Sequence, residues 1–594
     1  VKGRFGFDYI SHPHRLTKPL IRRYDAPAKG LNVDPSNPLT HFREATWEEA
    51  MDAAANGLAH LRDTKGGKSI AGFGSAKCSN EEAYLFQKLI RAGFHHNNVD
   101  HCTRLCHASS VAALMENVGS AAVTATFNEI ENADCAIIIG SNSIENHPVA
   151  ATYFKQFSKR GGNMIVMDPR GVGLGRHANH RLKFKPGTDV AMLNAIMHVI
   201  VDEDLQDKEY VAKYTENWEA MKTHLLDFSP EKMAPICGVD AETLRTVARE
   251  FATAKAAMIF WGMGVSQHIH GTDNARCLIS LALMTGNVGK PGAGLHPLRG
   301  QNNVQGASDA GMIPMFLPDY QTVTDDTIRA KFIDLWQSED FGAEKGLTVV
   351  EIIDAIHNDD INGMYILGEN PAMSDPDVEH ARDALAKLDH LVVQDIFLTE
   401  TANYADVILP ASAWAEKSGT VTNTNRQVQM GRPAVPSPGD ARPDWAITTD
   451  LAQRLGLDWN YTHPSEVFAE MKMVMNSLDN ITWERLERET VTYPSLSPED
   501  PGQAIVFTDG FPRPDKRAKF TPAEIVSPAE TPDAEYPFIL ITGRQLEHWH
   551  TGTMTRRTNV LNAVEPEANC SLHPRTLKKL GVEPGGMVNL TTRR

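Results

Sequence analysis

Short apolar runs alternate with helical patterns along most of this chain, and this alternation constrains the fold more than any other feature. The apolar runs are continuous, as expected of parallel strands that are buried on both faces. We therefore expect an α/β fold with several doubly wound parallel-sheet domains. The predicted strands are residues 68–74, 135–142, 163–170, 256–264, 363–371, 391–397 and 405–411, and the predicted helices are residues 80–94, 148–162, 272–286 and 378–388.

Bulk composition limits the class of protein and its partners. At 594 residues with 42% apolar residues, the chain is too long for one core, so roughly three or four domains are expected. No apolar run approaches about 18 residues, so we do not expect a membrane span. The net charge of −17 argues against a nucleic-acid partner. The seven cysteines are mostly isolated, which predicts a reducing, cytoplasmic compartment.

Many of the predicted strands end in glycine or polar residues. Ligands of parallel sheets collect at the carboxyl ends of strands, so these ends together predict an extended, nucleotide-like ligand. Each end taken alone is equally typical of a tight turn, and none carries the full G-x-G-x-x-G pattern. The ends in question are GFGSAK, IIGSNSIENHP, VMDPR, WGMGVSQH, ILGENP and QDIFLTET.

Two distant segments carry the strongest chemical signal. Cys106 and His107 are adjacent in HCTRLCHASS, and Arg299 opens the polar run RGQNNVQGASD. A thiolate is a soft ligand for a transition metal, histidine moves protons near neutral pH, and arginine grips a carboxylate at two points. The polar run is poor for a core helix and predicts a rigid hydrogen-bonding loop. Together the residues indicate redox chemistry on a small acid.

Both segments resemble the catalytic subunit of molybdenum- or tungsten-dependent formate dehydrogenases, closest to the soluble NAD-linked type. The resemblance runs almost end to end, from VKGRFGFDY to the last residues. It implies a fold of the molybdopterin oxidoreductase type, and a cofactor of two molybdopterin guanine dinucleotides that hold one Mo or W. It further implies that Cys106 ligates the metal, Arg299 orients formate, and His107 stabilises the pose and accepts or relays the proton.

The resemblance also implies which residues contact the two dinucleotides. One dinucleotide would lie against Asn142, Glu145, Asp168, Arg170, Gly187 and Asp189, and the pterins and second guanine against Met263, Gly264, Gln267, Gly368, Glu369, Asp395 and Thr399. The mixture of cations, imidazoles and hydroxyls in residues 543–557 suits a diphosphate, although a solvated basic loop would look the same. Its candidate residues are Arg544, His548, Trp549, His550, Thr551 and Arg556.

The implied domain organisation follows the same resemblance. Residues 1–44 would form the remainder of an N-terminal region next to an iron–sulfur cluster. A split α/β pterin-binding domain would comprise residues 45–103 and 302–412, around an α/β domain at 104–301 that carries Cys106, His107 and Arg299. Residues 413–534 are rich in Pro, Asp and Gly and predict a connecting region with few regular elements. Residues 535–594 would start a C-terminal β-barrel-like, cofactor-binding domain, with a strand at 536–544.

The implied reaction is reversible oxidation of formate to carbon dioxide, with electrons leaving toward NAD on a partner subunit. In the family a Lys-Gly like Lys2-Gly3 follows the last cysteine of a [4Fe–4S] motif. We therefore expect upstream sequence that binds a [4Fe–4S] cluster, with Lys2 between that cluster and one pterin. Further Fe–S and flavin-bearing subunits would complete the route, so these residues alone should not reduce NAD.

Three alternatives remain open at this point. A zinc site could use Cys102 and Cys106 with their flanking histidines, but no second paired cluster accompanies them. A nitrate reductase of the same superfamily typically has methionine where this chain has His107. A non-catalytic scaffold subunit with the pterin fold would not be expected to keep Cys106, His107 and Arg299 together.

Overall fold

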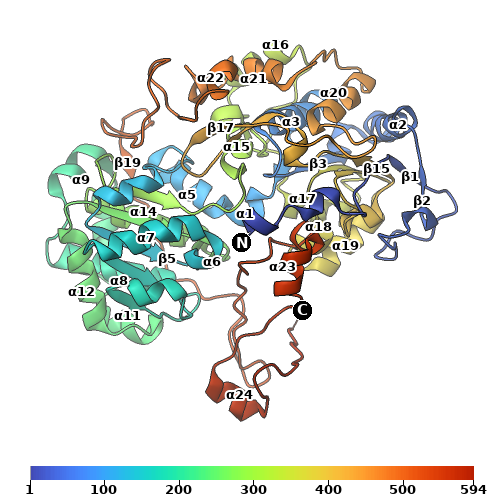
Figure 1. Ribbon diagram of the computed structural model, residues 1–594. Helices are drawn as coiled ribbons and strands as arrows, with labels where there is room; N and C mark the ends of the chain where they lie inside the picture. Colours follow the sequence, from blue (N-terminus) through green and yellow to red (C-terminus); the bar gives the residue numbers. More distant parts are fainter. Residues whose placement is uncertain (1, 594) are drawn as a thin grey trace.

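The computed structural model describes residues 2–593 of the chain. Two largely parallel sheets, each covered by helices on both faces, form its two main bodies (Figure 1). The predicted α/β fold is therefore confirmed, and the predicted strands and helices up to residue 411 lie within a few residues of their expected positions. Within the described range, no helix is both long enough and apolar enough to cross a membrane.

The first sheet has seven strands in the order β2-β1-β15-β14-β13-β3-β4. Strand β1 runs antiparallel to both of its neighbours, β2 and β15, and all other neighbouring strands of the sheet are parallel. Strands from residues 20–101 and strands from residues 363–410 therefore pair in one sheet, although the second sheet lies between them in the sequence. The strands are β1 (Leu20–Arg22), β2 (Phe42–Glu44), β3 (Ile70–Gly74), β4 (Val99–His101), β13 (Gly363–Leu367), β14 (His390–Asp395) and β15 (Val407–Pro410).

The second sheet has five strands in the order β10-β9-β5-β6-β7, all parallel. Ile137 and Ile139 of β5 face a core shared with α8 and α14, whereas Ile138 faces a second core shared with α7. Because neighbouring residues of a strand point to opposite faces, a continuous apolar run fills both cores. The strands are β5 (Cys135–Ile139), β6 (Asn163–Met167), β7 (His180–Leu182), β9 (Ala257–Trp261) and β10 (Gly294–Pro297).

Helices flank both sheets, and several begin at capping boxes. In α3 the Ser79 hydroxyl accepts from the Glu82 backbone N–H while the Glu82 carboxylate accepts from that of Ser79, which satisfies two N-terminal donors. Around the first sheet lie α2 (Trp47–Lys65), α3 (Asn80–Phe94), α16 (Asp326–Trp336), α17 (Val349–His357), α18 (Pro371–Ser374) and α19 (Val378–Lys387). Around the second lie α5 (Ala108–Val118), α6 (Ser143–Asn146), α7 (Pro148–Lys159), α8 (Asp189–Asp202), α9 (Lys208–Tyr214), α10 (Trp218–Leu225), α11 (Pro230–Cys237), α12 (Ala241–Thr253), α13 (Met263–Ser266) and α14 (Gly271–Met284).

Residues 413–534 contain more regular structure than the sequence predicted. Helices α20 and α21 pack on α3, and β16, β17 and β18 form a small antiparallel sheet beside it. The apolar positions of these elements join the core under α3, which is a tertiary interaction that the Pro- and Asp-rich turns between them conceal. The elements are β16 (Gly419–Thr422), β17 (Gln427–Gly431), α20 (Asp444–Arg454), α21 (Pro464–Lys472), α22 (Trp483–Leu486) and β18 (Val491–Thr492).

The strand predicted at residues 536–544 is wrong. Residues 538–541 are apolar but half exposed, and within residues 2–593 no strand pairs with them. A strand needs a hydrogen-bonded neighbour, so the apolar pattern alone does not produce one. The described part of this region instead contains the short helices α23 (Asn559–Val564) and α24 (Pro574–Leu580), and α24 projects from the body (Figure 1).

Candidate active site

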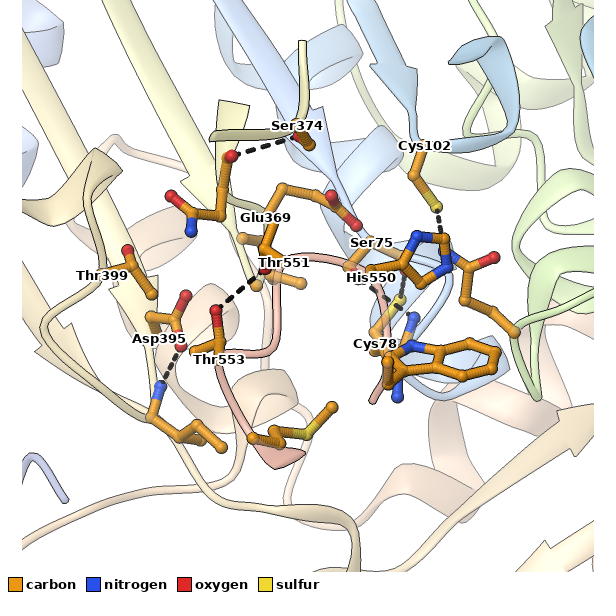
Figure 2. A pocket seen from close by; sticks show the side chains of 18 of the residues that line it. Ser75, Cys78, Cys102, Glu369, Ser374, Asp395, Thr399, His550, Thr551 and Thr553 are labelled. Carbon is orange, nitrogen blue, oxygen red and sulfur yellow. Dashed lines mark hydrogen bonds between the residues drawn. The ribbon is translucent and has the colours of Figure 1, made fainter. Parts of the chain in front are cut away.

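The carboxyl ends of the first sheet open into a cavity of about 240 Å³. Ser75 follows β3, Glu369 follows β13, and Asp395 ends β14, so three neighbouring strands deliver polar groups to the same space. Figure 2 shows these side chains lying around the cavity together with Cys102 and His550. Parallel sheets bind ligands at this edge, as the strand-end residues predicted.

A second cavity lies at the corresponding edge of the second sheet. Ser141 follows β5, Met263 follows β9 and Leu298 follows β10, and all three line it. The two cavities share the lining residues Cys106, Arg544, Trp549 and His550. Each sheet therefore has one cavity at the carboxyl ends of its strands, and the two cavities meet at Cys106, the predicted metal ligand.

Cys106 ends the short helix α4 (Thr103–Cys106), where the chain turns into α5. Its sulfur lies 3.6 Å from the sulfur of Met263 and 3.9 Å from Oε1 of Gln301. Burial raises the pKa of the thiol to about 11, while the charges of Arg544 and Arg299 lower it. A bound cation would favour the thiolate in this position.

His107 is fully buried and lines neither cavity. Its Nε2 donates to the carbonyl oxygen of Leu298 at 3.1 Å. Nδ1 lies 3.1 Å from the hydroxyls of both Ser110 and Ser266, so it accepts. Burial, followed by the charge of Arg299, lowers the pKa of His107 to about 3. The imidazole is therefore neutral and holds the Cys106 turn against the segment that carries Arg299.

Arg299 is buried at 4% exposure and is only partly satisfied. Nη2 donates to the carbonyl oxygen of Ala121 at 2.5 Å. Nε and Nη1 have no hydrogen-bond partner among the described residues. A buried guanidinium with unpaired donors is suited to a small anion, because leaving those donors unpaired is costly.

The segment after Arg299 differs from its predicted form. Residues 304–309 form the buried helix α15 (Val304–Asp309) instead of a loop. The polar side chains are satisfied inside the helix, because Gln305 donates to Asp309 at 2.5 Å and Ser308 to the Val304 carbonyl at 2.9 Å. Internal hydrogen bonds of this kind remove the cost of burying a polar helix.

Burial shifts the acids and the lysine of the first cavity toward their neutral forms. It raises the pKa of Glu369 to about 8 and that of Asp395 to about 7. It lowers the pKa of Lys77 to about 8. Near neutral pH these groups can therefore both donate and accept hydrogen bonds to a polar ligand.

The loop at 543–557 closes both cavities. Arg544 donates to Nδ1 of His550 at 2.8 Å, and Nζ of Lys77 lies 4.9 Å from the ring centre of Trp549. Lys2 reaches the same loop, because its Nζ donates to the carbonyl oxygens of Leu546 and, at 3.4 Å, of His548. The N-terminal segment and this loop are thus joined at the second cavity.

The residues predicted to hold one guanine gather beyond β5 and β6. Both carboxylate oxygens of Asp189 are buried without a partner in residues 2–593, and burial raises its pKa to about 6. Asp168 is close enough to Asp189 to contribute to that rise, and Arg170 lies against Gly543. Two unpaired buried oxygens at the start of α8 fit a ligand that donates hydrogen bonds, as a guanine edge does.

The ends of two strands approach each other so closely at Gly140 and Gly264 that only glycine fits at these positions. The Gly264 N–H donates to the Gly140 carbonyl at 2.9 Å, and a Cβ on Gly264 would lie 2.8 Å from the Gly140 Cα. Gly140 itself has a φ of +59°, which favours glycine. This contact joins the ends of β5 and β9 beside the second cavity.

The predicted site residues fall into two groups. Those that line a cavity are Lys2, Cys106, Met263, Gln267, Gly368, Glu369, Asp395, Thr399, Arg544, His548, Trp549, His550 and Thr551. Those that line neither are His107, Asn142, Glu145, Asp168, Arg170, Gly187, Asp189, Gly264, Arg299 and Arg556. Sequence reasoning missed Lys77, Gln301 and His147 as lining residues, although Lys77 belongs to the strand end GFGSAK and Gln301 follows Arg299 by two positions.

The zinc alternative lacks its ligand set. Within the described residues, no three His, Cys, Asp or Glu side chains group as metal ligands would. Nε2 of His101 lies 3.1 Å from the Ser308 hydroxyl, and His107 bonds to Leu298 and two serines. The CxxxC pattern therefore does not become a four-ligand site.

Comparison with known families identifies the class of protein that this fold and site define. The sequence pattern of the family described as "Molybdopterin oxidoreductase" matches residues 15–454, and that of "Molydopterin dinucleotide binding domain" matches residues 538–594. The chain is an enzyme of the molybdopterin oxidoreductase family. The second match covers the region in which the predicted strand is missing.

Curated relatives narrow the class. The chain is 42% identical over 596 residues to "F420-dependent formate dehydrogenase subunit alpha" of Methanocaldococcus jannaschii, covering 100% of this chain and 85% of the relative. It is 35% identical over 603 residues to "Formate dehydrogenase H" of Escherichia coli, covering 100% and 82%. Among solved structures, "Acetylene Hydratase from Pelobacter acetylenicus" superposes with a TM-score of 0.75 at 20% identity over 97% of this chain and 81% of that one, a likeness of fold.

Proposed function

We propose that this chain catalyses the reversible two-electron oxidation of formate to carbon dioxide. The observation that carries the proposal is Arg299, a buried guanidinium with two unpaired N–H groups whose charge reaches Cys106. A planar guanidinium of this kind binds a carboxylate at two points. The names of the relatives from Methanocaldococcus jannaschii and Escherichia coli point to the same substrate.

We propose that the two cavities hold two molybdopterin guanine dinucleotides and that Cys106 ligates their Mo or W. The residues fit such a group, because the cavities meet at Cys106 and the two oxygens of Asp189 are buried without partners among residues 2–593. Asp168 and Asp189 would hold one guanine, and Asp395 and Thr399 the other. The cofactor, when bound, supplies the two-electron redox chemistry, and the protein supplies orientation and electrostatics.

The protein's own groups would then position formate. Arg299 holds the carboxylate and fixes the direction of the C–H bond, which is a gain from orientation. His107 supports this pose through its hydrogen bond to Leu298, the residue before Arg299. Both ring nitrogens of His107 already have hydrogen-bond partners, so proton relay through it would also require another acceptor.

We propose that electrons leave on the side of Lys2. Its Nζ lies between the loop carbonyls and 5.8 Å from the Trp549 ring centre, at the edge of the second cavity. A [4Fe–4S] cluster, followed by Fe–S and flavin-bearing partner subunits in the cytoplasm, would carry the electrons onward. The final acceptor would be NAD, as the sequence resemblance implied, or F420, as the names of several relatives suggest.

The test uses purified holoenzyme whose Mo, W and pterin contents have been measured. Formate oxidation is assayed with a dye acceptor, and nitrate reduction with a reduced dye. Formate turnover without nitrate turnover is expected. Nitrate turnover alone would indicate the nitrate reductase alternative, and loaded enzyme inactive with both substrates would refute the proposal. Residues 1–594 alone should oxidise formate with the dye but should not reduce NAD.

A further inference from the structure

Two histidines from different parts of the chain hold the backbone of the segment that carries Arg299. The carbonyl oxygen of Leu298 accepts from Nε2 of His107 at 3.1 Å. The carbonyl oxygen of Arg299 itself accepts from Nε2 of His147 at 2.9 Å. Residues 298–300 belong to no helix or strand, so these side-chain bonds help to fix the point from which the guanidinium extends.

His147 lies where α6 ends and α7 begins. Its N–H donates to the Ser143 carbonyl at 2.9 Å at the end of α6, and its carbonyl accepts from the Ala151 N–H at 2.8 Å at the start of α7. Pro148 follows at the first position of α7, where its missing N–H costs no helical hydrogen bond. Both helices therefore fix the backbone of His147 and limit where its imidazole can lie.

The two ring nitrogens of His147 have different roles. Nε2 faces a carbonyl oxygen, which can only accept, so Nε2 carries the ring hydrogen. Burial lowers the pKa of His147, the hydrogen bond to Arg299 partly offsets this effect, and the charge of Arg544 adds to it. The imidazole is therefore neutral near pH 7, and Nδ1 is an acceptor. Nδ1 is buried and has no partner among residues 2–593.

The unpaired Nδ1 belongs to the wall of the second cavity. His147 lines this cavity together with its neighbour Asn146, whose Oδ1 is also buried without a partner in the described chain. Leu298 and Gly300, the residues before and after Arg299, line the same cavity. This wall thus has two unpaired acceptors beside the segment that carries Arg299. Buried acceptors are costly when unpaired, so the wall suits a ligand with N–H donors.

We propose that His147 is a positioning residue that couples the ligand of the second cavity to Arg299. Nδ1 accepts a hydrogen bond from an N–H group of that ligand, a pterin ring in the proposed function, while the Nε2 hydrogen holds the Arg299 carbonyl. An imidazole bonded at both nitrogens keeps one orientation, so the filled cavity fixes the guanidinium for its carboxylate more firmly than the empty one. The inference rests on the proposed function, and His147 acts through Arg299 without touching formate.

Two substitutions separate the roles of the two nitrogens. His147→Gln places an amide N–H where Nε2 lies and removes the acceptor at Nδ1. His147→Asn keeps an acceptor oxygen near the place of Nδ1 but is too short to reach the Arg299 carbonyl. The two readouts are the affinity of the holoenzyme for azide, a small anion that Arg299 can bind, and the fraction of pterin that stays bound after mild heating.

Each variant should lose one property and keep the other. In His147→Asn, the Kd for azide, measured by calorimetry, should rise about fivefold, the effect of one neutral hydrogen bond. KM for formate should rise in parallel, whereas pterin retention should match the wild type. In His147→Gln, azide affinity and KM should match the wild type, whereas pterin should be released about fivefold faster, again for one hydrogen bond.

His198 on α8 provides the matched control. Its Nδ1 donates to the Leu225 carbonyl at 2.8 Å, and His198 lines neither cavity. His198→Asn and His198→Gln should keep wild-type azide affinity and pterin retention. Wild-type azide affinity in His147→Asn, or wild-type pterin retention in His147→Gln, would overturn the coupling. Loss of both properties in both variants would show a purely structural role and would overturn it as well.

Azide affinity and pterin retention do not depend on turnover, so this inference and the proposed function are tested separately. If loaded wild-type enzyme does not oxidise formate, the proposed function fails whatever the azide measurements show. If formate is oxidised but the two His147 variants behave like the wild type, the coupling alone is refuted.

Discussion

Nε2 of His107 donates a hydrogen bond to the carbonyl oxygen of Leu298 across 3.1 Å. This bond joins the residue after the predicted metal ligand to the residue before the predicted carboxylate clamp. It ties the turn between α4 and α5 to the end of β10, two segments that the sequence separates widely. The relative position of Cys106 and Arg299 therefore depends on an internal hydrogen bond as well as on the two sheets.

Replacement of Cys106 by serine should abolish most formate oxidation and leave the fold intact. Serine is a harder and far less ionised ligand, so it should not hold the metal as the thiolate would. Turnover with a dye acceptor, metal analysis and circular dichroism measure the effect. Cys277→Ser, at a buried cysteine inside α14, is the control for sulfur loss and should stay active. Near-normal turnover with bound metal in Cys106→Ser would exclude Cys106 as the ligand.

Replacement of Arg299 by lysine should raise KM for formate and lower kcat. Lysine keeps the charge but loses the planar two-point grip. Loss of one charge-assisted hydrogen bond costs about 1.5–3 kcal/mol, which corresponds to roughly tenfold to a hundredfold in kcat/KM. Arg276→Lys is the control, because Arg276 pairs with Glu116 on α5, outside both cavities. Unchanged kcat and KM in Arg299→Lys would place this arginine outside the substrate pocket. Azide should compete with formate in the wild type, where Arg299 can bind it, and less well in Arg299→Lys.

The bond between His107 and Leu298 predicts that His107 and Arg299 act as a unit. His107→Ala should shift the segment that carries Arg299, so the losses from His107→Ala and Arg299→Lys should not add in the double variant. Coupled sites typically deviate from additivity by about 0.5–3 kcal/mol. A double-mutant cycle on kcat/KM measures the deviation. Additive losses would show that the hydrogen bond does not position Arg299.

Replacement of Lys417, which pairs with two buried carboxylates beside α3, should cause a large loss of stability. Nζ of Lys417 donates to Glu82 at 2.9 Å and to Asp444 at 2.5 Å, and all three side chains are nearly buried. Lys417→Met would leave both carboxylates without their cation, at a cost of about 3–5 kcal/mol. Lys68→Met breaks the exposed pair with Glu344 and should leave the stability almost unchanged, because solvent screens that pair. Thermal unfolding of the holoenzyme compares the two variants, and equal melting temperatures would contradict the buried-pair argument.

The sequence by itself determined the class of fold. Continuous apolar runs such as residues 135–142 predicted strands buried on both faces, and β5 has this environment because both of its faces carry helices. The strand ends also predicted where polar residues gather, and residues such as Glu369 and Asp395 do line one cavity. These features follow from local pattern and from the geometry common to all parallel sheets, so no knowledge of long-range contacts was needed.

Tertiary structure decided everything that depends on distant pairing. The sequence pattern of α3 contains Glu81, Lys88 and Arg91, yet the whole helix is buried, because remote segments cover these charges. Glu81 accepts from Thr420 of β16, Lys88 donates to Glu470 of α21, and Arg91 donates to the carbonyl oxygens of Gly311, Ile313 and Phe316. The apolar residues 538–541 form no strand, because within the described chain no partner strand lies beside them. The pairing of Leu298 with His107, and that of Arg299 with His147, join segments whose separation no local pattern encodes. Local sequence thus sets the elements, whereas burial and hydrogen bonding between remote segments set the site.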